Sequence, residues 1–191
     1  MRGAIHRRAA FFPGVSPCPY GVGMPRDQHR SAVYAAEDQL RSTLERGGPV
    51  DFFGSTLDVP AERHFADLPS IQAYVDSVLA LTPVVGSWPD ASPVCVRERA
   101  GASKAHYEPG GTIAIPLAGP VQSRWAARES VVLHELAHHL VWSDSDPAHG
   151  PRFCGALVRL YQYAISPSAG LLLRAGLDSA GVPLVEPGVA A

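Results

Sequence analysis

The sequence contains little cysteine. Its 191 residues include only Cys18, Cys95 and Cys154, which lie far apart and form no CxxC pair. A small, odd-numbered and scattered set argues against a disulfide framework and against a cysteine-based zinc ribbon. Cys154 falls within a helical pattern, where we expect a small buried apolar residue. We therefore look to other residue types for the chemistry of this protein.

An excess of positive charge is also missing. Lys104 is the only lysine, and 16 Lys and Arg stand against 18 Asp and Glu, which gives a net charge of −2. The arginines are scattered along the chain instead of forming a basic cluster. Such a chain has no bulk positive field that would hold nucleic acid or an anionic membrane. We therefore expect neither as a partner.

Long hydrophobic runs are absent as well. No segment approaches the roughly 20 consecutive apolar residues that a membrane-spanning helix needs. The apolar residues 9–12 are too few for the core of a signal peptide, and Pro13 follows them directly. We therefore expect a cytoplasmic protein, with export by another route left open.

The composition predicts a single domain with two irregular ends. The chain is 46% hydrophobic, which is typical of a globular protein. Residues 1–26 hold four prolines and four glycines without an apolar period, so we expect a disordered extension. Residues 27–182 form the predicted domain, and residues 183–191 form a tail that frays. Whether translation starts at Met1 or Met24 is left open.

Apolar periodicity predicts both helices and strands. The predicted helices cover residues 27–46, 67–82, 122–142, 150–165 and 169–180, and the extended segments cover residues 50–53, 55–57, 94–99, 105–107 and 112–115. Residues 105–107 and 112–115 flank a turn sequence and predict a hairpin. Pro116 favours an edge position for the second strand of this hairpin. The pattern predicts the α+β class, with a small sheet beside packed helices.

The helix predicted at 122–142 contains the motif HExxH, formed by His134, Glu135 and His138. Histidines at i and i+4 project from one helical face, where their ring nitrogens can share a tetrahedral zinc ion. Glu135 then lies beside the metal and is free to act as a base. Chance alone predicts roughly 0.014 such matches at this composition. Buried histidines and a buried glutamate are costly unless they are paired or ligated.

A catalytic zinc site needs a third protein ligand, and several residues after the motif are candidates. The extended pattern HExxHxxGxxH fails because Val141 and Asp144 stand where glycine and histidine are required. A glutamate ligand on the next helix is excluded, since no acidic residue follows Asp146 until position 178. We favour His149, at the start of the next helix, over the alternatives Asp144 and Asp146.

Residues around the motif offer supporting roles. His139 points about 100° away from His138, so we do not expect it to bind the same metal ion. Carboxylates that accept a hydrogen bond from the free ring nitrogen usually orient zinc-binding histidines, and the candidates are Glu129, Asp144 and Asp146. Arginines suited to a substrate carboxylate or an oxyanion are Arg124, Arg128 and Arg152. The residue that stabilises the oxyanion stays unassigned.

Residues 134–140 (HELAHHL) and 149–153 (HGPRF) together resemble the zincin metalloproteases. They are similar to the SprT-like branch, whose third ligand is a histidine in an HGxxF-like segment. They resemble still more closely an uncharacterised actinobacterial family of small HExxH metallohydrolases. The match covers about residues 112–153. It implies a zincin-like single domain in which a small antiparallel or mixed sheet packs against the active-site helix and further helices.

The resemblance also implies a site and a substrate. It places Zn²⁺ on His134, His138 and His149, makes Glu135 the catalytic base, and lets the strand at 112–115 pair with an extended peptide. We therefore expect a zinc-dependent hydrolase, foremost a metallopeptidase acting on a peptide or protein. The alternatives are a zinc-stabilised binding or regulatory protein without turnover and a non-peptide amidohydrolase. The DNA-linked SprT-like proteases usually carry a basic or zinc-ribbon extension, which this chain lacks. Cleavage specificity and oligomeric state are left open.

Overall fold

The computed structural model describes residues 26–101, 104–120 and 124–188. The extension predicted at 1–26 lies outside the described residues except for Arg26. The helices are α1 (Arg30–Arg46), α2 (Leu68–Leu79), α3 (Thr82–Ser87), α4 (Glu129–Val141), α5 (Pro151–Leu160) and α6 (Pro167–Ser179). The strands are β1 (Gly48–Phe52), β2 (Ser55–Val59), β3 (Cys95–Glu98), β4 (His106–Glu108) and β5 (Thr112–Ile115). The protein therefore has the predicted α+β fold.

The larger sheet has three strands in the order β3-β5-β4, with β3 parallel and β4 antiparallel to β5. The predicted hairpin is confirmed as β4 and β5, but the edge position predicted for β5 is wrong. Pro116 is tolerated beside a central strand because it follows Ile115, the last paired residue. Both sides of β5 are occupied, so the expectation that residues 112–115 pair with a peptide is also wrong. The edges of this sheet are β3 and β4.

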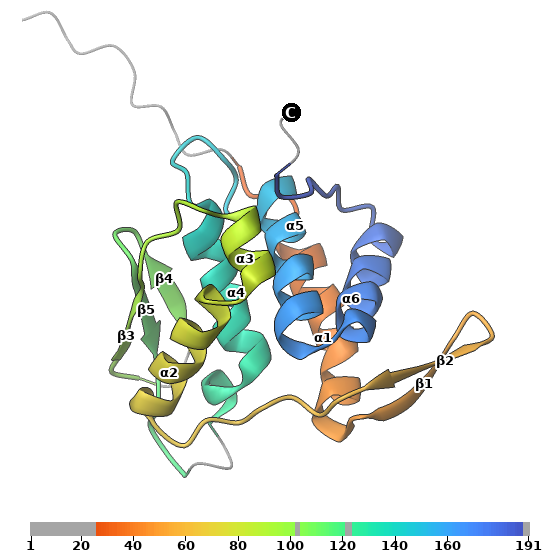
Figure 1. Ribbon diagram of the computed structural model, residues 1–191, viewed down its shortest axis with the longest axis horizontal. Helices are drawn as coiled ribbons and strands as arrows, with labels where there is room; N and C mark the ends of the chain where they lie inside the picture. The colour runs from red at the N-terminus through yellow and green to blue at the C-terminus, as the bar shows by residue number, and fades with distance from the viewer. Residues whose placement is uncertain (1–25, 102–103, 121–123, 189–191) are drawn as a thin grey trace, which may run out of the picture.

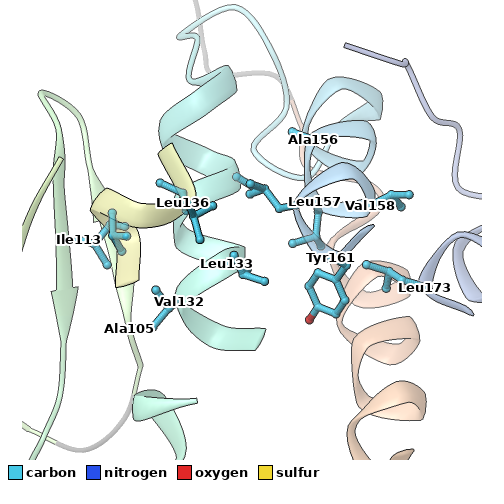
Figure 2. Packing of buried hydrophobic residues seen from close by; sticks show 14 of the residues in the cluster. Ala105, Ile113, Val132, Leu133, Leu136, Ala156, Leu157, Val158, Tyr161 and Leu173 are labelled. Atoms are coloured by element: carbon cyan, nitrogen blue, oxygen red, sulfur yellow. The ribbon is translucent and has the colours of Figure 1, made fainter. Parts of the chain in front are cut away.

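Helix α4 lies between the three-stranded sheet and the helices α1, α5 and α6 (Figure 1). Figure 2 shows Leu136 directed toward Ile113 of the sheet and Leu133 directed toward the helices. Both leucines have no solvent exposure, and each buried leucine side chain contributes about 1.5–3 kcal/mol to stability. This two-sided burial fixes the orientation of the helix that carries the motif.

The start of α4 differs from the prediction. The helix begins at Glu129 and not at residue 122, because residues 125–127 form a short 3-10 turn, η2, and Arg128 is extended. Arg128 pairs as an isolated β-bridge with His64, and the amide of Ser130 donates to the buried carboxylate of Glu62 at 3.1 Å. These contacts with residues 62–65 outweigh the helical preference of the local sequence. The negative charge of Glu62 is also favourable at the amino end of α4, where the helix dipole is positive.

Other boundaries also depend on neighbouring segments. Pro83, expected to end a helix, lies in the first turn of α3, where proline is well tolerated. The helix predicted to reach residue 165 continues past α5 only as a π-helical turn, η3 (Tyr161–Ile165). The described part of the predicted tail contacts α5, since the amide of Val185 donates to the carbonyl of Pro151 at 3.0 Å. No described helix combines the length and the apolarity required to cross a bilayer.

The hairpin of β1 and β2 forms a separate two-stranded sheet that projects from the helices (Figure 1). Its strands pair in register from Gly48 opposite Val59 to Phe52 opposite Ser55. The turn uses Phe53 and Gly54, both with positive φ. The hairpin is far from the motif in sequence and does not form part of the histidine cluster described below.

Candidate metal centre

The structure brings His134, His138 and His149 together. One ring nitrogen from each residue lies within 4.8 Å of the others, which is close enough for a shared metal ion. His134 and His138 lie one turn apart on α4, as the motif predicts, and His149 comes from the turn before α5. Asp144 and Asp146 do not belong to this group, and Asp146 instead lies 3.2 Å from Arg152.

A tight turn directs His149 back toward α4. The amide of Gly150 donates to the carbonyl of Pro147 at 2.9 Å, and Gly150 precedes α5, which begins at Pro151. A Cβ atom at Gly150 would lie 3.0 Å from the Pro147 carbonyl oxygen, so this close approach favours glycine. The glycine and proline that follow His149 thus shape the turn that presents this ligand.

Two carboxylates hold two of the three histidines. Nδ1 of His134 lies 2.9 Å from Oε2 of Glu37 on α1, and Nδ1 of His149 lies 2.6 Å from Oδ2 of Asp27 just before α1. A carboxylate only accepts hydrogen bonds, so the ring nitrogens are the donors. Neither acid was among the candidates from sequence. The candidate Glu129 instead accepts hydrogen bonds from the backbone and side chain of Arg63 and from Tyr74.

The cluster fits a bound cation. An imidazole that donates from Nδ1 and is neutral presents a lone pair at Nε2. The Nε2 atoms of His134 and His149 face each other at 3.3 Å. Two nitrogens bound tetrahedrally at about 2.0–2.1 Å from zinc lie about 3.3–3.4 Å apart. The two rings are therefore already spaced as ligands of one tetrahedral ion.

The cluster also favours neutral rings at two positions. Burial, together with the neighbouring imidazoles, lowers the pKa of His138 to about 2. Burial likewise lowers the pKa of His149, although Asp27 acts in the opposite direction. At His134 burial acts against the charged form, but the charge and hydrogen bond of Glu37 outweigh it and raise the pKa. A metal ion requires the neutral form of each ligand.

Two aromatic rings contact the cluster. The ring centre of Phe153, which is 2% exposed, lies 4.3–5.0 Å from those of all three histidines. The ring of Tyr34 is stacked on His134 at 5.3 Å and 13°, and its centre lies 5.3 Å from that of His149. Phe153 belongs to the HGPRF segment, whereas no sequence pattern pointed to Tyr34.

Glu135 lies at the wall of a cavity of about 320 Å³ that also contacts His134 and Tyr34. The carboxyl group is buried, and this burial raises its pKa. The neighbouring backbone of Tyr107 on the edge strand β4 acts on this pKa in the opposite direction. The glutamate of the motif is thus near the first histidine of the cluster and near β4, an edge strand of the described sheet.

His139 lies outside the group of three, as its direction on the helix predicted. Its Nε2 lies 2.8 Å from the carbonyl oxygen of Ser92, and its ring contacts Tyr107 at 5.5 Å edge to face. His139 therefore links α4 to β4 and to the loop before β3. His106 on β4 lies 3.0 Å from Glu108 and 2.7 Å from Arg99.

The three candidate arginines have protein partners. Arg124 donates to the backbone carbonyls of Gly119 and Ala66, at 2.9 and 2.8 Å. Arg128 pairs with Glu45 and Glu62. Arg152, paired with Asp146, lines a second cavity of about 210 Å³ that reaches His138. Arg152 thus borders a cavity next to the cluster.

The cysteines take no part in the group of three. Cys154 is fully buried, which confirms the expectation from sequence, and burial raises the pKa of its thiol to about 12. Cys95 is exposed on β3, and Cys18 lies outside the described residues.

Comparison of the chain with protein-family models, with curated proteins and with solved structures finds no match. The functional assignment therefore depends on the residues themselves: three clustered histidines, two carboxylates behind them and a glutamate beside them.

Proposed function

We propose that the protein is a zinc-dependent hydrolase of the zincin type, and specifically a metallopeptidase. The observation that carries the proposal is the buried cluster of His134, His138 and His149, with two ligand nitrogens 3.3 Å apart. Three imidazoles and one open position are typical of catalytic zinc. When bound, zinc supplies a Lewis acid that polarises a carbonyl oxygen and lowers the pKa of water.

Glu135 is the base of the proposed reaction. Its carboxylate takes a proton from the attacking water as the C–O bond forms at the peptide carbonyl. The C–N bond then breaks, and Glu135 delivers the proton to the departing amine. Burial raises the pKa of Glu135, which strengthens its carboxylate as the base that takes the proton from water.

The edge strand β4 supports a peptide as the substrate. In antiparallel pairing, an extended peptide adds to an exposed strand edge through backbone hydrogen bonds. The residue that contacts Glu135 from β4 is Tyr107, through its backbone. A peptide along this strand would bring a backbone carbonyl next to the base. The net charge of −2 gives no support to a nucleic acid as substrate.

A zinc-loaded sample assayed against a broad peptide library tests the proposal. The wild type should cleave peptides, whereas Glu135→Gln should retain one equivalent of zinc and lose about 10²–10⁴-fold in kcat. Glu98→Gln, an exposed change on β3 away from the cluster, is the matched control and should keep full activity.

Other outcomes would favour the alternatives. If the wild type cleaves no peptide and zinc removal unfolds it, the metal supports a binding or regulatory protein. If the wild type hydrolyses small amides and ignores peptides, the protein is a non-peptide amidohydrolase. Equal peptide hydrolysis by Glu135→Gln would refute the role of this base.

A further inference from the structure

The two aromatic rings at the cluster differ in their access to solvent. Phe153 is 2% exposed and closes the cluster toward the core, whereas Tyr34 is 39% exposed. Tyr34 contacts the rings of both His134 and His149, each at 5.3 Å between ring centres. Tyr34 is therefore at a solvent-accessible side of the cluster, where one of the two cavities that border it opens.

Tyr34 also shares a cavity with the proposed base. It lines the cavity of about 320 Å³ together with His134 and Glu135. After burial, the negative charge of Glu135 is the largest influence that raises the pKa of the Tyr34 hydroxyl, so the two groups are near each other. A neutral phenol is a hydrogen-bond donor, whereas an ionised carboxylate only accepts. The cavity thus has an acceptor, Glu135, and a donor, Tyr34, beside His134.

Arg30 lies beside Tyr34. It is one helical turn earlier on α1, with its guanidinium carbon 5.7 Å from the centre of the Tyr34 ring. Its positive charge lowers the pKa of the Tyr34 hydroxyl, against the larger effects of burial and Glu135. A guanidinium only donates hydrogen bonds, so a phenol oxygen that meets it accepts and keeps its own proton for another acceptor.

We propose that Tyr34 is a catalytic residue that donates a hydrogen bond to the carbonyl oxygen of the substrate as negative charge develops there, with Arg30 as its positioning residue. The inference rests on the proposed hydrolase function. Arg124 and Arg128, considered from sequence, are less suited because protein acceptors engage them. A donor aimed at developing charge contributes about 10²–10³-fold to kcat.

The test measures binding of methylphosphonate, a tetrahedral anion the size of the reacting centre, to the cobalt(II)-loaded protein by visible absorption. Tyr34→Phe retains the ring and removes the hydroxyl. It should bind cobalt(II) within twofold of the wild type and bind methylphosphonate at least tenfold more weakly. Tyr163→Phe, which removes a hydroxyl near Arg159, is the matched control and should change neither affinity.

The role of Arg30 has its own readout. Arg30→Leu should weaken methylphosphonate binding severalfold, and Arg30→Lys should restore most of it, because the ammonium group can still donate to the phenol oxygen. A loss that lysine does not restore would contradict the positioning role.

The outcomes separate this inference from the proposed function. If Glu135→Gln loses hydrolysis but Tyr34→Phe binds methylphosphonate and cleaves peptide like the wild type, the hydrolase stands and the inference falls. If the wild type cleaves no substrate but binds methylphosphonate in a Tyr34-dependent way, the donor role stands and the hydrolase falls. A wild type that does not bind methylphosphonate would overturn the inference directly.

Discussion

Helices α4 and α1 build the same site in different ways. Helix α4 provides two histidines of the cluster, His134 and His138, and the adjacent Glu135. Helix α1 and the residue before its start provide groups that act on those side chains: Glu37 and Asp27 through hydrogen bonds, and Tyr34 through ring contact. The site is thus assembled from segments about a hundred residues apart, so we expect metal binding and docking of α1 to stabilise each other.

We expect the largest loss of zinc affinity when a histidine of the cluster is removed from α4. His138→Ala should reduce zinc affinity roughly a thousandfold or more, because only two of the three proposed ligands remain. Competition with a chelating dye measures this affinity. His139→Ala, one position along the helix, is the control and should change zinc affinity far less, since His139 contacts Ser92 instead of the cluster. Equal losses in the two variants would contradict the ligand assignment.

We expect a smaller loss of zinc affinity when the hydrogen bond from α1 to His134 is weakened. Glu37→Gln keeps the size of the side chain but replaces the charged acceptor of His134, and outer partners of this kind contribute about 10–100-fold to metal affinity. We expect a loss near the upper end, because the Glu37 side chain is only 12% exposed. The same dye competition measures it. Asp38→Asn, the adjacent exposed acid paired with Arg41, should leave zinc affinity unchanged.

Asp27→Asn should weaken zinc binding less than Glu37→Gln does. The Asp27 side chain is 24% exposed, so water replaces part of its interaction with His149. We expect a loss of about tenfold, at the lower end of the range for such partners. A larger loss than that of Glu37→Gln would show that α1 matters less than the segment before it.

The smallest predicted effect concerns pH and the metal-free protein. The lowered pKa values of His138 and His149 mean that the unfolded chain binds more protons than the folded one below pH 6.5, so stability falls as pH decreases. Between pH 7.5 and 5.5 His138 removes about 1.4 kcal/mol of stability, and His149 contributes a loss of the same sign. The raised pKa of His134 has the opposite sign: its stabilisation is present below pH 6.5 and lost as pH rises through the folded value.

Glu37 raises the pKa of His134 and so causes the opposite sign of its pH effect. The pH dependence of stability is therefore a second test of the role of α1. In Glu37→Gln, burial becomes the dominant influence on His134 and should lower its pKa. The variant should therefore lose about 1 kcal/mol more than the wild type between pH 7.5 and 5.5. Urea unfolding in the presence of a chelator measures both proteins. An identical pH dependence would show that Glu37 does not set the charge of His134.

The contrast between α4 and α1 also explains what the sequence could predict. His134 and His138 follow from helical periodicity alone, because four residues make about one turn. The return of His149 to them was inferred by excluding other ligands after the motif, and the structure places it within 4.8 Å of the others. These inferences needed only local geometry and a short loop.

Glu37, Asp27 and Tyr34 could not be found in the same way. Glu37 lies beside the buried stripe of α1, next to Ala36, a position that exposed acids share in most amphipathic helices. Nothing local links it to a histidine 97 positions later. The start of α4 was missed for a similar reason, because the extended backbone of Arg128 depends on its pairing with His64. Contacts between distant segments determine both the partners of the histidines and the start of α4.

The most direct test of the central claim is diffraction from zinc-loaded crystals on both sides of the zinc absorption edge. We predict a single anomalous peak about 2.0–2.1 Å from one ring nitrogen each of His134, His138 and His149. A peak coordinated by Asp144 or Asp146 in place of His149, or no peak among the three histidines, would contradict it.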